Sequence, residues 1–220
     1  MNSMHEMTIT QWLLLLGLGA FHGINPGMGW LFAVSLGMQE RRRGAVLSAL
    51  LPLGIGHALA VAAAITVALL AGVVFPMHWL RWGVAIILVA FGAARLYRHR
   101  HPRWASMRVG PAALTLWSFL MAWAHGAGLM VVPVFLTMTA AAAGPGHHHD
   151  HAMQMSAATP ATALLATGLH ATGYLVVTAI LALLVFEKLG VAILRKTWFN
   201  LDLLWALSLI ATGLLTAVLA

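Results

Sequence analysis

The chain has 220 residues, of which 61% are hydrophobic and only 8% are charged. So few polar groups cannot coat a soluble globule of this size, and the composition predicts an all-α integral membrane protein. The net charge of +7 does not indicate nucleic-acid binding, because the basic residues form short clusters with no soluble domain to present them. Cysteine is absent, which excludes disulfides and thiolate metal sites.

Six apolar runs reach or exceed the roughly 20 residues that a helix needs to cross a bilayer. They predict six transmembrane helices, over 9–36, 45–71, 78–97, 112–140, 160–185 and 199–219. The first run carries no basic n-region and no cleavage signature, so we expect it to remain in the protein as a helix.

The basic residues predict the orientation of these helices. Clusters at 41–43, 95–108 and 188–196 contain every Lys and Arg except Arg81, which lies on the opposite side. Short loops rich in Lys and Arg stay in the cytoplasm. We therefore expect a multi-pass protein of a bacterial-type inner (plasma) membrane, with both termini outside.

Two pairs of short motifs indicate an internal repeat. The sequence GAFHG at 19–23 is similar to AWAHG at 122–126, and GIGHA at 54–58 is similar to GLHA at 168–171. A three-helix unit that is repeated once must invert, because an odd number of crossings turns the second copy over. The sequence thus predicts a 3+3 inverted repeat.

The repeat predicts one membrane domain of two three-helix halves, 1–110 and 111–220, with an external His- and Met-rich loop over 144–160. Such folds place the substrate near the midplane, where interrupted helices expose backbone groups. The segment 25–27 (Asn-Pro-Gly) and the glycines of 126–128 predict that the first and fourth helices are broken or kinked there.

Four histidines stand singly near the middle of apolar runs. They are His22, His57, His125 and His170. A lone buried histidine can simply bond a neighbouring carbonyl, but an imidazole at membrane depth usually faces a partner or a ligand. Four at repeat-related positions predict one shared site. Neutral imidazole binds transition metals well, and Asn25 and Met28 are further candidate ligands beside the first break, although Met also fills packing gaps.

Carboxylates are absent from the middle of the predicted helices. Glu6, Glu40, Asp150, Glu187 and Asp202 all lie in tails, in loops or near a helix end. A dehydrated dication held only by imidazoles would keep its full charge in a medium of low dielectric constant. A partly hydrated dication or monovalent Cu(I) is therefore easier to accommodate.

The loop between the fourth and fifth runs contains a short histidine tract. Its residues are His147, His148, His149, Asp150 and His151. Flexible imidazoles in such a tract raise the local ligand concentration, which favours metal capture, although a passive polar spacer has the same composition.

The motif HGINP at 22–26 resembles the first-helix motif of NicO and UreH-type nickel and cobalt transporters, which belong to the LysE superfamily. The motif GIGHA at 54–58 resembles their second-helix motif. This resemblance implies a 3+3 inverted repeat, a His-rich loop and transport of nickel or cobalt. The family usually continues with Asp-His where this chain has Gly27-Met28, which leaves copper and zinc as alternative substrates.

These patterns predict a secondary transporter of a transition-metal cation. Metal/proton antiport would follow, because imidazoles must lose protons to bind metal. We expect no enzymatic activity and no resident cofactor, since no Ser or Asp shares a consistent helical frame with the histidines. The expected partners are the metal ion and the lipid bilayer, and a homo-oligomer is compatible with the sequence.

Two other classes of function stay open. One is a membrane haem protein that carries electrons, with histidines as axial ligands. The other is an exporter of a small organic molecule or anion from the same superfamily.

Overall fold

The computed structural model describes residues 2–74, 76–97, 110–143, 160–189 and 201–218. Every regular element in these ranges is helical, which confirms the all-α prediction for them. In chain order the elements are α1 (Asn2–Ile24), the 3-10 turn η1 (Pro26–Met28), α2 (Trp30–Glu40), α3 (Arg43–Val74), α4 (Met77–Tyr97), α5 (Pro111–Ala124), α6 (Ala127–Ala143), α8 (Pro160–Leu184), the π-turn η2 (Val185–Leu189) and α9 (Leu201–Val218).

Two of these helical segments are long and apolar enough to cross a membrane. They are Arg43–Gly72 and Pro160–Lys188, and a third candidate arises if α5 and α6 are counted as one bent span. Three further apolar helical segments are shorter: Ile9–Ile24, His78–Ala94 and Ala206–Val218. The lengths in the described part of the chain therefore do not establish the six-span arrangement, partly because the first predicted run is divided between α1 and α2.

Both expected helix interruptions are present, and the first follows His22. The chain leaves the α1 helix after Ile24, and the side-chain Oδ1 of Asn25 accepts a hydrogen bond of 2.9 Å from the Gly27 N–H, which caps η1. Gly29 has a φ of 126°, a conformation that disfavours side chains. The indole Nε1 of Trp30 donates to the Ile24 carbonyl at 3.1 Å and so satisfies the last turn of α1.

The second interruption lies at His125. α5 ends at Ala124, the His125 N–H donates to the Met121 carbonyl at 2.9 Å, and Gly126 adopts a φ of 70°. α6 then starts in a new direction, bent by 64° from α5. The two histidines that the sequence places in broken helices therefore both lie at a helix break.

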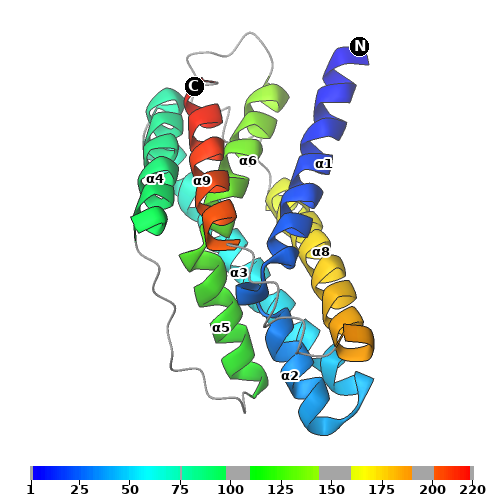
Figure 1. Cartoon of the computed structure of the whole chain (residues 1–220). Helices are drawn as coiled ribbons and strands as arrows, with labels where there is room; N and C mark the ends of the chain where they lie inside the picture. Colours follow the sequence, from blue (N-terminus) through cyan, green and yellow to red (C-terminus); the bar gives the residue numbers. More distant parts are fainter. Residues whose placement is uncertain (1, 75, 98–109, 144–159, 190–200, 219–220) are drawn as a thin grey trace.

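The helices pack in pairs that are distant in the sequence. α1 lies along α8, α4 along α9 and α5 along α3 (Figure 1). Glycines permit this close approach: a Cβ on Gly19 would lie 1.9 Å from the His170 carbonyl oxygen, and a Cβ on Gly56 would lie 2.1 Å from that of Thr115. Small residues at helix contacts are typical of packing in membranes.

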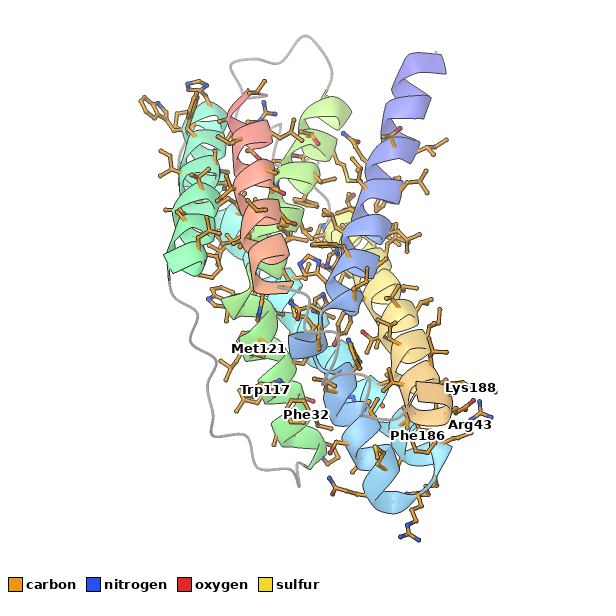
Figure 2. The ribbon with its side chains drawn as sticks, in the orientation of Figure 1. Phe32, Arg43, Trp117, Met121, Phe186 and Lys188 are labelled. Carbon is orange, nitrogen blue, oxygen red and sulfur yellow. The ribbon has the colours of Figure 1, made fainter. Side chains whose placement is uncertain are left out.

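The two ends of the bundle differ in composition. The first residues of α1 and the last residues of α9 lie at one end (Figure 1). At the other end Arg43 forms an ion pair with Glu187, next to Lys188 and Phe186 (Figure 2). Between the ends, much of the outer surface consists of exposed Leu, Ile and Val side chains on α1, α3, α4 and α8. Such a surface suits contact with lipid better than contact with water.

Candidate functional site

Three of the four histidines meet inside the bundle. His22 comes from α1, His57 from α3 and His170 from α8, and each has 0% of its surface exposed. Their ring centroids are 5.1 Å (22 to 170), 5.3 Å (57 to 170) and 5.7 Å (22 to 57) apart. Residues separated by up to 148 positions therefore form one buried cluster, which we call the histidine cluster.

Backbone carbonyls fix the orientation of two rings of the histidine cluster. The Nδ1 atom of His22 lies 2.5 Å from the Leu18 oxygen, and that of His170 lies 3.1 Å from the Leu15 oxygen. A carbonyl oxygen can only accept, so this hydrogen-bond pattern assigns the ring proton of the neutral imidazole to Nδ1 and leaves a lone pair on Nε2. Metal-binding histidines usually donate such a hydrogen bond from the ring nitrogen that does not bind the metal.

His57 takes the opposite tautomer. Its Nε2 lies 3.2 Å from the Nε2 of His170, and since His170 must accept there, His57 donates. The Nδ1 atom of His57 is buried and has no hydrogen-bond partner among the residues that the structure describes. Its ring stacks on Tyr174 with centroids 4.0 Å apart and an interplanar angle of 9°. The Tyr174 hydroxyl in turn donates to the Met28 carbonyl at 2.6 Å.

The fourth histidine, His125, lies at the α5–α6 break next to η1. It is 3% exposed, and its Nδ1 lies 2.8 Å from the Met121 carbonyl oxygen. Its Cε1 would lie 3.8 Å from a Cβ built on Gly27, a position that is also 3.2 Å from the Asn25 Oδ1. The structure thus places it beside η1, where the two helix breaks meet.

As they stand, the side chains do not form a ligand sphere. No group of three or more His, Cys, Asp or Glu within the described ranges has the geometry to hold a metal ion. The hydrogen bond between His57 and His170 accounts for this in part, because each Nε2 points at the other instead of at a common centre. For both atoms to bind one ion, this bond must break and His57 must move its proton from Nε2 to Nδ1.

The other predicted ligands have structural partners. Asn25 is buried, and its Oδ1 caps η1, while its Nδ2 has no hydrogen-bond partner among the described residues. The Met28 side chain lies in a hydrophobic cluster with Met130, Leu136 and Tyr174. The histidine tract of the loop, residues 147–151, lies outside the described residues.

Sequence reasoning missed Tyr174 and Ser118, which both support the site. Tyr174 follows His170 by four residues, so the two side chains share one face of α8. The Ser118 hydroxyl on α5 donates to the Leu53 carbonyl on α3 at 2.6 Å, one turn before His57. The i+4 spacing could have identified Tyr174, whereas nothing in the local sequence connects Ser118 to α3.

The chain matches no family model, and no curated protein and no solved structure is significantly similar to it.

Proposed function

We propose that the protein is a secondary transporter that moves a transition-metal cation across a membrane through the histidine cluster. The observation that carries this proposal is the convergence of His22, His57 and His170 from three helices at one fully buried place. A histidine that only stabilises packing needs a single hydrogen-bond partner. Three imidazoles in contact within an apolar interior form a concentration of ligand atoms that packing does not require.

The environment of the cluster supports movement of a substrate through it. The α1 helix ends two residues after His22, and α5 ends at the residue before His125. Broken helices at the midplane expose backbone groups and let the two halves of a helix move separately, as in inverted-repeat transporters. The breaks are therefore suitably placed for alternating access to the cluster.

A six-crossing 3+3 inverted repeat remains our proposed architecture, in one domain with halves 1–110 and 111–220. In this repeat the first span corresponds to the fourth and the second to the fifth. The packing of α1 on α8 is then equivalent to the packing of α5 on α3, which supports the repeat. It is also supported by His22 and His125, which each place Nδ1 on the carbonyl four residues before. The Arg-rich end at 41–43 lies opposite the start of α1, which suits termini outside a bacterial-type inner membrane.

The charge of the site bears on the identity of the cation. The two ion-paired carboxylates of the described residues, Glu40 and Glu187, both pair with arginines at the basic end of the bundle. A cluster of neutral imidazoles favours Cu(I) or a partly hydrated Zn, Ni or Co ion. The motif resemblance favours Ni and Co. Proton antiport fits a site whose ligands also titrate, and the external tract at 147–151 fits capture or release of the ion.

Transport by purified protein tests this proposal. Proteoliposomes are loaded with a metal-sensitive dye, and influx of Ni, Co, Cu(I) and Zn is compared for the wild type and His170→Ala. The matched control is His78→Ala, whose histidine is exposed at the start of α4. We expect the His170 variant to lose at least about tenfold in flux of one metal, and the control to retain it. Equal flux for all three proteins would exclude the cluster as the transport site.

A haem protein is the weaker alternative. Axial histidines lie on opposite faces of the porphyrin, whereas the Nε2 atoms of His57 and His170 are hydrogen-bonded to each other. Purified protein is therefore expected to show no Soret absorption, and a strong Soret band would favour the electron-transfer function.

A further inference from the structure

A small cavity lies between four helices, away from the histidine cluster. It has a volume of about 140 Å³ and lies between α1, α4, α6 and α9. Its accessible wall is mostly apolar, with residues such as Leu14, Val134 and Leu215, and the uncharged polar side chains of Gln11 and of three threonines also line it. One charged side chain, Arg81 of α4, also lines it.

One nitrogen of Arg81 lacks a hydrogen-bond acceptor within the described part of the chain. The side chain as a whole is half-buried, but its Nε is buried and makes no hydrogen bond to any residue that the structure describes, and neither of the ion pairs found in those ranges includes it. A guanidinium presents five N–H donors and stays charged at any physiological pH. Leaving a buried N–H of such a group beside hydrocarbon is unfavourable, so the Arg81 Nε favours an anionic acceptor.

The surroundings indicate where the anion comes from. Leu14 and Leu215 are 50% and 60% exposed on the outer surface, so the cavity opens sideways toward lipid. The neighbouring Trp79 is 68% exposed, and Trp82 is also exposed. Exposed tryptophans mark the level of the lipid headgroups. Arg81 therefore lies where a lipid phosphate is available and where the opening favours an amphiphile over a free ion.

We propose that this cavity binds one membrane phospholipid. The phosphodiester oxygens accept hydrogen bonds from the Arg81 guanidinium in the two-pronged geometry that arginine and phosphate favour, and the start of an acyl chain lies along Leu14, Val134 and Leu215. The proposal rests on the membrane location that we propose for the protein, but not on metal transport. The bound lipid would fill the space between α1 and α6, the outward halves of the two broken helices.

Native mass spectrometry of the full chain tests the assignment. Protein in detergent is supplied with phosphatidylglycerol, washed by detergent exchange, and the retained lipid is counted for the wild type, Arg81→Gln and Arg81→Lys. Arg42→Gln is the matched control, since it removes an exposed arginine at the opposite end of the bundle. We expect one retained lipid for the wild type and the Arg42 variant. Retention should fall about tenfold in Arg81→Gln and less in Arg81→Lys, which keeps the charge but not the two-pronged contact.

Two parallel arms identify the source of the anion. Inorganic phosphate is added without lipid, and Glu6→Gln is compared with the wild type, because Glu6 precedes the cavity on α1. We expect inorganic phosphate alone not to stabilise the fold. We expect Glu6→Gln to retain as much lipid as the wild type. Lipid retention in Arg81→Gln equal to that of the wild type, or stabilisation of the fold by inorganic phosphate alone, would each overturn the proposal. Metal flux is not a readout here, so failure of this site leaves the transport proposal to its own test.

Discussion

The Nε2 atoms of His57 and His170 lie 3.2 Å apart and share a hydrogen bond, although the residues belong to α3 and α8. Because His170 bonds the Leu15 carbonyl through Nδ1, His57 must be the donor in the neutral pair. The pair thus has a defined proton, which must move from Nε2 to Nδ1 of His57 before one ion can bind both Nε2 atoms.

Replacing His57 by Phe should separate packing from ligand chemistry. Phe keeps an aromatic ring to stack on Tyr174, whose ring centroid lies 4.0 Å from that of His57, but removes both ring nitrogens. We expect metal binding to weaken by at least about tenfold while the unfolding temperature in detergent stays close to that of the wild type. Equilibrium dialysis with metal analysis measures the first quantity, and a thermal shift assay the second. Unchanged dialysis in a folded variant would remove His57 from the site.

The Tyr174 hydroxyl should anchor the first helix break. Tyr174→Phe leaves the Met28 carbonyl buried without its donor, and such a loss costs about 1–3 kcal/mol of stability. The matched control is Thr172→Val on the same helix, whose exposed hydroxyl bonds only within α8. Chemical denaturation in detergent compares the two variants. A Tyr174 variant as stable as the control would show that this hydrogen bond does not hold η1 in place.

Close packing of α1 on α8 should depend on Gly19 but not on Gly17. A Cβ on Gly19 would meet the His170 carbonyl at 1.9 Å, whereas a Cβ on Gly17 would meet nothing within 4 Å. Gly19→Ala should therefore force the helices apart and lower stability by about 1–3 kcal/mol, together with metal binding. Gly17→Ala should leave both unchanged. Thermal unfolding measures the stability of the two variants, and equilibrium dialysis measures their metal binding. Equal stability and equal metal binding in the two variants would contradict the close packing of α1 on α8 at Gly19.

The sequence was informative where local chemistry determines the result. Asn25-Pro26-Gly27 cannot continue a regular helix, and the break occurs there, as it does at Gly126. The apolar runs likewise predicted the helical class. The lengths of individual spans were harder to predict, because a run of apolar residues has the same composition whether the helix within it is straight or broken.

The details of the site depend on contacts between distant helices. Four separate histidines in apolar segments predicted a shared site, and the structure brings His22, His57 and His170 into one cluster. The tautomers could not be predicted, since they follow from which carbonyl each Nδ1 reaches. His170 reaches Leu15 on another helix, a contact set by the close approach of α1 and α8 and not by any local motif.

Lower pH should weaken metal binding to the cluster. Metal binds the neutral imidazole, so protons compete with it, and affinity is lost as the pH falls through the range in which the free site takes up protons. For each proton displaced, the apparent dissociation constant should rise up to about tenfold per pH unit below that range. Above it, affinity should be constant with pH. Dialysis over a pH series that extends down to about pH 4 measures the slope, and the same series in His170→Ala tests its origin. The variant should bind weakly with a shallower slope, because it lacks one competing imidazole, whereas an equal slope in both proteins would assign the proton competition to groups outside the histidine cluster.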